Sequence, residues 1–182
     1  MAQQLAEISE TLQTFIEEQR VFFVGTAPRE GRINVSPKGS DSLRVVSSKR
    51  VLWLNLTGSG NETAAHVAEN GRMTIMFCSF TEKPLILRLY GQARAVHPRD
   101  ADWQALRSLF APVIGARQVI DMEVDLVHTS CGWGVPICEY VSERQKLQEW
   151  ADGKGTEGIK QYWLEKNSAT IDGKSTGIED KR

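Results

Sequence analysis

The sequence lacks the features that mark several common classes of protein. Its three cysteines form no C-x-x-C pair, and an odd number fits free thiols in a reducing compartment better than a disulfide framework. No apolar run approaches the roughly 18 residues that a membrane helix needs. The first residues also lack the basic and then apolar layout of a signal peptide. We therefore expect a cytoplasmic protein with no membrane-spanning segment.

Neither sign of charge is in excess, and familiar catalytic motifs are missing. The 22 Lys and Arg residues balance 23 Asp and Glu residues, so the net charge is -1 and neither nucleic acid nor a membrane is an expected partner. None of the three histidines has a partner at metal-ligand spacing, so no metal site is expected. No G-x-S-x-G, paired-carboxylate or Ser/His/Asp signature appears, and no catalytic residue is assigned.

The chain is instead rich in short strand-like segments. With 182 residues and 41% hydrophobic composition it can bury a core. Segments of β-branched and aromatic residues follow one another with short turn signals between them, at residues 21–27, 32–37, 42–46, 50–56, 72–80, 84–96 and 117–130. Few helices separate these segments, which disfavours a parallel doubly wound sheet. The pattern predicts a mainly β (α+β) fold, an antiparallel barrel with flanking helices.

Helical patterns lie mainly at the two ends of the chain. Apolar residues at spacings of three and four predict an amphipathic helix from Leu5 to about Gln19. Residues 97–110 read as a second helix, and residues 142–153 as a third, which 157–169 either continues or follows as a separate helix. The end of the chain is polar and is expected to be disordered or peripheral. We divide the chain into a barrel domain (1–140), a helical extension (141–168) and a polar tail (169–182).

One stretch, "LTGSGNETAAHVAENG" at residues 56–71, joins a loop of Gly, Ser, Thr and Asn to an alanine-rich helix. Backbone N–H groups at a helix N-terminus have no intrahelical acceptor, and the helix dipole adds partial positive charge, so this arrangement suits a phosphate. Ser59, Asn61 and Thr63 are the candidate side-chain ligands. The alternative is that Asn61 or Ser59 merely caps the helix and that Gly71 ends it, as in many surface helices.

Three basic residues lie at or inside the predicted strands around this stretch. Lys38 follows a strand in the turn "SPKG", Arg72 opens the strand after the helix, and Arg88 interrupts the apolar run "LILRLYG". An arginine in an apolar strand is costly unless its guanidinium reaches solvent or an anion. These residues are either anion ligands or, alternatively, solvated surface and salt-bridge residues.

The order of strand, "SPKG", "LNLTGSGNETAAH", "NGRMTIMF" and "LRLYG" resembles the FMN-binding split barrels of the pyridoxamine 5'-phosphate oxidase-like superfamily. It is most similar to the branch of pyridoxamine 5'-phosphate oxidase-related FMN-binding proteins, which has a late segment like "CGWGVP" at residues 131–136. The resemblance covers residues 21–140. It implies a split barrel and a homodimer with FMN at the subunit interface.

The resemblance also implies which residues lie along the flavin ring. The segment 33–38 matches the family segment that runs along the flavin and ends in a lysine, so Val35, Ser36 and Lys38 are candidate ligands. Lys38 would stabilise negative charge on the reduced ring. Trp133 either stacks on the ring or packs in the core.

At the phosphate, this sequence departs from the family pattern. Asn61, Glu62 and Thr63 fall where the oxidases carry a serine and a basic pair. A glutamate would repel a phosphate, so we expect Glu62 to face away and Ser59, Asn61, Thr63 and backbone amides to bind, helped by Arg72 or Arg88.

A second departure concerns the substrate. After His97 the chain offers only "PRDADWQ", without the tyrosine, arginine and serine set that clamps the substrate phosphate in the true oxidases. The expected function is therefore an FMN-dependent oxidoreductase acting on another small molecule. The alternatives are a non-catalytic protein that binds, stores or senses FMN or haem, and a deazaflavin-dependent reductase.

Overall fold

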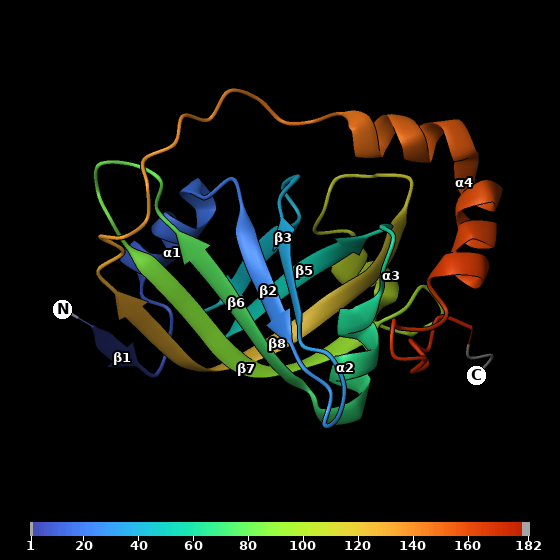
Figure 1. The fold of residues 1–182 in the computed structure, drawn as a ribbon, viewed down its shortest axis with the longest axis horizontal. Coiled ribbons are helices and arrows are strands. Elements are labelled where there is room, and N and C mark those ends of the chain that lie inside the picture. The colour runs from blue at the N-terminus through green and yellow to red at the C-terminus, as the bar shows by residue number, and fades with distance from the viewer. Residues whose placement is uncertain (1, 180–182) are drawn as a thin grey trace.

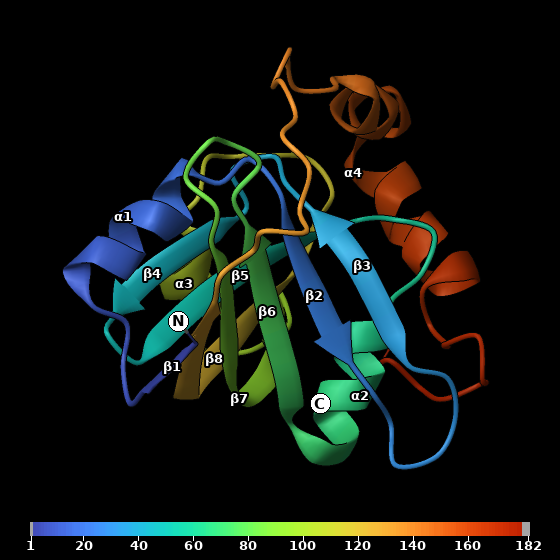
Figure 2. The same cartoon turned by 60° about the vertical axis from the view of Figure 1, so that its left-hand side comes forward.

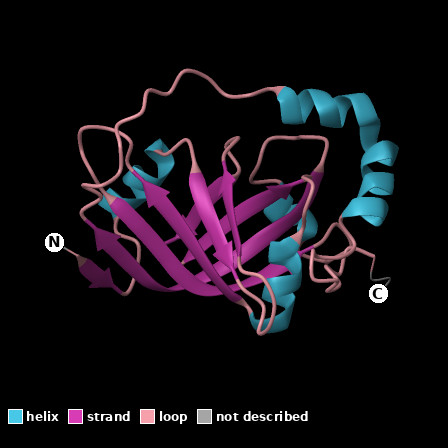
Figure 3. Cartoon of the chain, viewed as in Figure 1, coloured by secondary structure: helices cyan, strands magenta, loops and turns pink. Residues whose placement is uncertain are grey.

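Eight antiparallel strands form one sheet in the computed structural model, which describes residues 2–179. The strands are β1 (Gln3–Leu5), β2 (Phe22–Thr26), β3 (Asn34–Lys38), β4 (Leu43–Ser47), β5 (Arg50–Leu56), β6 (Arg72–Cys78), β7 (Ile86–Val96) and β8 (Ala116–Ser130). The helices are α1 (Glu10–Glu18), α2 (Glu62–Asn70), α3 (Trp103–Arg107) and α4 (Lys146–Lys166). Figure 3 shows the helices arranged around this curved sheet.

The sheet curls without closing. Its order is β3-β2-β6-β7-β8-β5-β4, so β3 and β4 end this path, and the short β1 pairs with β8 beside it. The longest strands are β7 and β8; β7 pairs with β8 along its whole length, and the two form the floor of the curved sheet in Figure 1. This arrangement confirms the predicted antiparallel split barrel with flanking helices.

Alternation along the strands decides which side chains enter the core. In β2, for example, Phe22, Val24 and Thr26 are buried while the residues between them are partly exposed. Phe22 packs edge-on against the Trp53 ring, with 6.4 Å between the ring centroids, and also contacts Phe77. The period of two thus fills one face of the sheet with apolar side chains.

A glycine allows the two longest strands to stay together at a bulge. The register of β7 and β8 shifts between Tyr90 and Gly91. A Cβ atom at Gly91 would overlap the backbone carbonyl group of Glu123 on β8. Only glycine therefore fits at this point of close backbone approach.

The helices differ from the sequence-based predictions at their boundaries. The first helix begins at Glu10 rather than near Leu5, because Leu5 pairs with β8 as part of β1 and the Ser9 hydroxyl caps the helix at Leu12 N–H. The expected helix at 97–110 shortens to α3. Helix α4 begins at Lys146, four residues later than predicted, and is interrupted at Gly155, whose φ is +65°.

Residues 169–179 of the polar tail, which was expected to be disordered or peripheral, pack against the rest of the protein, and residues 180–182 lie outside the described part of the chain. Thr170 and Thr176 are buried, and a bridge joins Ala169 to Ser175. Figures 1 and 2 both place this segment beside α2, at the far end of α4. The polar composition of this segment did not predict its packing, because it is held by hydrogen bonds such as those of Ile171 and Thr176 rather than by an apolar face.

Candidate functional site

A cavity of about 280 Å³ lies where the loop before α2 meets β3, β5 and β8. Alternation along β3 turns Asn34, Ser36 and Lys38 toward this cavity. The other lining residues are Trp53, Asn55, Leu56, Gly58, Ser59, Gly60, Asn61, Glu62, Thr63 and Arg117. The cavity thus joins the two sequence segments that we linked to one ligand.

The N-terminus of α2 opens into this cavity without a side-chain cap. Asn61 occupies the N-cap position, but its side chain makes no capping hydrogen bond. It is buried, accepts a hydrogen bond from Asn55 Nδ2 at 3.4 Å and donates to the Asn167 carbonyl at 3.3 Å. The simple capping role is therefore not observed for Asn61. Gly71 does end the helix in the left-handed conformation, as expected.

Arg117, at the start of β8, is the main positive charge of the cavity. Its side chain is 2% exposed and donates to the Gly60 carbonyl at 3.0 Å, Asn167 Oδ1 at 2.6 Å and Asn55 Oδ1 at 3.2 Å. All three acceptors are neutral, and its buried Nε has no partner. Burial lowers the pKa of Arg117 to about 9, which leaves the guanidinium charged at neutral pH.

Lys38 adds a second cation. Its Nζ lies over the Trp53 ring, 5.0 Å from the centroid. Burial and the nearby charge of Arg117 lower the pKa of Lys38 to about 8. The positive charges of Lys38 and Arg117 therefore repel each other across the same cavity.

Glu62 is the one acidic residue among those that line the cavity, and it does not offset these charges. Its carboxylate accepts a hydrogen bond from the backbone N–H of Ile171, at 3.1 Å to Oε1 and 3.3 Å to Oε2. Glu62 therefore lines the cavity while a backbone amide binds its carboxylate, and its turning away from a phosphate stays a prediction. The cavity is left with two cations and no carboxylate paired to either of them among the described residues.

The structure brings some of the predicted site residues together and leaves others apart. Ser36, Lys38, Ser59, Asn61 and Thr63 line the cavity, whereas Val35, Arg72, Arg88 and Trp133 do not. Val35 alternates to the other face of β3 and is 67% exposed, and Trp133 is 83% exposed. Arg88 Nη1 donates to Ser130 Oγ at 3.0 Å, and Arg72 is exposed at the start of β6.

Sequence reasoning missed three residues of the site. Arg117 looks like an ordinary polar residue at a strand start, and Asn55 like a polar residue on an alternating strand. Asn167 lies at the end of a predicted helix, where any polar residue is common. No local pattern separates these residues from surface ones, because their burial results from contacts between segments 50 or more residues apart.

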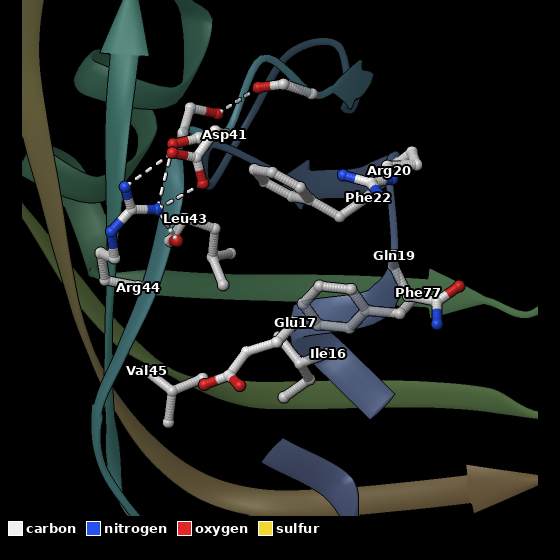
Figure 4. Close-up of a pocket in the computed structure, with 12 residues that line it drawn as sticks. Ile16, Glu17, Gln19, Arg20, Phe22, Asp41, Leu43, Arg44, Val45 and Phe77 are labelled. Atoms are coloured by element: carbon white, nitrogen blue, oxygen red, sulfur yellow. Dashed lines mark hydrogen bonds and ion pairs between the residues drawn. The ribbon is translucent and has the colours of Figure 1, made fainter. Parts of the chain in front are cut away.

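A second cavity, of about 240 Å³, shows the contrast. It lies between α1, β2 and β4, and Figure 4 shows Arg44 paired with Asp41 on one wall and the rings of Phe22 and Phe77 nearby. Here the guanidinium has its carboxylate, at 2.7 Å. The cavity beside α2 lacks such compensation.

Neither a metal site nor a membrane-spanning helix is found in the part of the chain that the structure describes. Within residues 2–179, no group of three or more His, Cys, Asp or Glu side chains is placed to hold a metal ion. No helix in that range is both long and apolar enough to cross a membrane.

Comparison with known proteins agrees with the fold. A pyridoxamine 5'-phosphate oxidase family protein of Aspergillus flavus, ustO, is 35% identical in an alignment 184 residues long, which covers 91% of this chain and 74% of that protein. The solved structure of the H111A variant of HupZ from Group A Streptococcus covers 68% of this chain and 99% of its own, with 22% identity and a TM-score of 0.57. A candidate pyridoxamine 5'-phosphate oxidase from Lactobacillus delbrueckii covers 68% and 94%, with 15% identity and a TM-score of 0.52.

At these identities the two solved structures establish the fold alone. The sequence match is broader, since residues 8–131 fit the profile of the pyridoxamine 5'-phosphate oxidase family, and this range contains β2 to β8 and the cavity beside α2. The chain therefore belongs to the pyridoxamine 5'-phosphate oxidase family.

Proposed function

We propose that this protein binds FMN, with the flavin phosphate in the cavity beside α2. The observation that carries the proposal is the buried guanidinium of Arg117, which has only neutral partners and an unpartnered Nε. An uncompensated buried charge is expensive in the folded state. A bound anion would supply the missing negative charge.

The other groups of the cavity fit a phosphate. The first amides of α2 lack a side-chain cap, so their N–H groups and the helix dipole are available to an anion. Lys38 supplies a second charge, and the hydroxyls of Ser59 and Thr63 can donate hydrogen bonds. We assign to Arg117 the role of the basic pair that the oxidases carry at the start of this helix.

The strand β3 suits the flavin ring. It pairs with β2 on one side and is an edge strand, so its other backbone edge is open next to the cavity. We place the ring along the segment 33–38. Val35, Arg72, Arg88 and Trp133 remain predicted contacts, and they lie outside the cavity that holds the phosphate.

Exposed apolar side chains support a homodimer. Ile33 on the approach to β3 is 74% exposed and Val35 is 67% exposed. Trp133, Ile137 and Val141 are exposed in the segment between β8 and α4, which Figures 1 and 2 place at the end of the sheet where β2 begins and β3 ends. A second copy of the chain would cover this surface.

A bound flavin accepts and donates a hydride or single electrons, so the activity we propose is an FMN-dependent oxidoreductase acting on a small molecule. The part of the chain is to bind the phosphate through Arg117, to orient the ring along β3, and to hold positive charge nearby on Lys38. The three cysteines are free thiols, which supports a reducing, cytoplasmic location.

The test is an absorbance spectrum of the freshly purified protein, followed by chromatography of the material that heat releases. We expect the two visible bands of an oxidised flavin, and FMN in the released fraction. Light scattering during size-exclusion chromatography should give twice the chain mass. A protein that contains no flavin and takes up no added FMN would refute the proposal. A yellow protein that no nicotinamide or other donor reduces would be a flavin carrier instead.

A further inference from the structure

We infer that Asn167 is the positioning residue of the phosphate site, and that the segment from Asn167 to Ile178, here named the C-terminal strap, is part of that site. The inference rests on the proposed binding of FMN. It assigns to the strap the task of holding both the loop before α2 and Arg117 in the geometry that receives the phosphate.

The side chain of Asn167 joins the two halves of the site. It is fully buried, and its Nδ2 donates to the carbonyls of Gly58 at 3.0 Å and Ser59 at 3.5 Å. Its Oδ1 accepts from Arg117 Nη1 at 2.6 Å. One amide therefore fixes the glycine-containing loop and the buried cation relative to each other.

Asn167 is itself held from two directions. Its backbone N–H donates to the Trp163 carbonyl at the end of α4, and Trp163 Nε1 donates to Thr57 Oγ1 at 2.7 Å. Its carbonyl accepts from Thr176 Oγ1 at 2.5 Å and from Asn61 Nδ2 at 3.3 Å. These contacts fix the backbone of Asn167 at the point from which its side chain reaches Arg117.

The strap also controls the acidic residue of the cavity. The N–H of Ile171, within the strap, binds the carboxylate of Glu62. Two further contacts anchor the strap beside α2: Lys174 Nζ bonds Glu69 Oε2 at 2.8 Å, and Asp172 pairs with Arg32. The strap thus binds the Glu62 carboxylate through a backbone amide, and this contact keeps the negative charge of Glu62 from turning toward the phosphate.

The amide of Asn167 is suited to this task because it donates on one side and accepts on the other. Alanine would remove both contacts and leave the Arg117 guanidinium held only by its bonds to Gly60 and Asn55. Aspartate has almost the same shape, but its carboxylate would face the Gly58 and Ser59 carbonyls and would neutralise Arg117 internally. Both changes should weaken the binding of a phosphate more than the binding of a flavin ring.

The experiment compares the dissociation constants of FMN and riboflavin, which differ only in the phosphate. Wild type, Asn167→Ala and Asn167→Asp are titrated by quenching of flavin fluorescence. The control is Arg99→Ala, because Arg99 donates to the carbonyls of Gly177 and Ile178 at the far end of the strap. We expect FMN affinity to fall at least about tenfold in both Asn167 variants, riboflavin affinity to change less than about twofold, and the control to match wild type.

An equal loss of FMN and riboflavin affinity would overturn the inference, because it would show a general structural role. Unchanged FMN affinity in Asn167→Asp would overturn it as well. If the Asn167 variants do not fold, Thr176→Val removes a bond that holds Asn167 and should show the same preference for losing FMN, in weaker form; unchanged FMN affinity in that variant would also count against the inference.

The proposed function fails separately. If wild type binds FMN and riboflavin equally well, flavin binding stands and the phosphate role of the strap falls. If wild type binds no flavin, the proposed function falls, and stabilisation by inorganic phosphate in a thermal shift assay decides the inference. A shift in wild type that Asn167→Asp loses would support the strap as part of an anion site, and no shift would overturn it.

Discussion

Replacement of Arg117 by methionine tests the site most directly. Methionine keeps much of the side-chain length and removes the charge and the donors. In wild type the guanidinium is 2% exposed, and its three hydrogen bonds go to neutral oxygens of Gly60, Asn167 and Asn55. The substitution therefore removes a buried charge that no carboxylate offsets.

The effects on stability and on binding have different sizes. Loss of the three hydrogen bonds costs about 1 kcal/mol each in the ligand-free protein, and removal of an unpaired buried charge offsets part or all of that cost. A charge-assisted bond to a phosphate is worth about 1.5–3 kcal/mol, which is roughly a 10- to 150-fold change in the dissociation constant. FMN affinity should therefore fall strongly in a protein that still folds.

The assay is calorimetric or fluorescence titration of wild type and Arg117→Met with FMN and with riboflavin. The matched control is Arg107→Met, since Arg107 is partly buried and donates to the Phe110 carbonyl at 3.0 Å, away from the cavity. The control should keep wild-type affinity for both ligands. Arg117→Lys should lie between wild type and Arg117→Met, because it retains a charge without the planar set of donors.

Equal affinity of Arg117→Met and wild type for FMN would refute the reasoning. So would a loss that is the same for riboflavin, because the argument assigns Arg117 to the phosphate. If Arg117→Met had a much higher free energy of unfolding than wild type and still bound FMN, no anionic ligand would be compensating the buried charge of Arg117.

Three further predictions follow from single residues. Burial and the charge of Arg117 lower the pKa of Lys38 to about 8, and a bound anion favours the protonated amine, so FMN affinity should decrease as pH rises above about 8. Lys38→Met should flatten this pH dependence of FMN affinity, and a flat profile for wild type would contradict the prediction. Burial lowers the pKa of His66, so the unfolded chain binds protons more readily and the free energy of unfolding should fall as pH drops below about 6.5. Urea unfolding of wild type and His66→Asn across that pH range measures the effect, and an equal change of the free energy of unfolding with pH in the two proteins would count against the prediction. Gly91→Ala should lower the free energy of unfolding by at least about 2 kcal/mol, because the added Cβ meets the Glu123 carbonyl. The control is Gly153→Ala, which has open space around it and should be neutral or stabilising. A Gly91→Ala variant as stable as wild type would show that the bulge can shift.

Much of the fold was predictable because strand patterns are local. The segments 50–56 and 117–130 coincide closely with β5 and β8, since alternating β-branched residues define a half-buried strand wherever it lies. Helix boundaries were less certain. Leu5 fits a helical period equally well, but pairing with β8 places it in β1, and that contact spans more than 120 residues.

The site was predictable where a motif is contiguous. Ser59, Asn61 and Thr63 share one loop and helix start, and Ser36 and Lys38 share one strand face, so their types and spacing already indicated an anion. Whether these two segments meet depends on the order of β3, β2 and β5 in the curled sheet, which no local pattern specifies.

The sequence by itself determined the class of fold, the family and the loop that suits a phosphate, because each rests on residue types at short spacing. The tertiary structure alone decided which cation faces that loop. Arg117 is buried there rather than Arg72 or Arg88, and Asn167 reaches it from the end of a predicted helix, where a polar residue carries no signal of a site. The physical reason is that burial and charge compensation are properties of the space between distant segments, and only the folded chain brings those segments together.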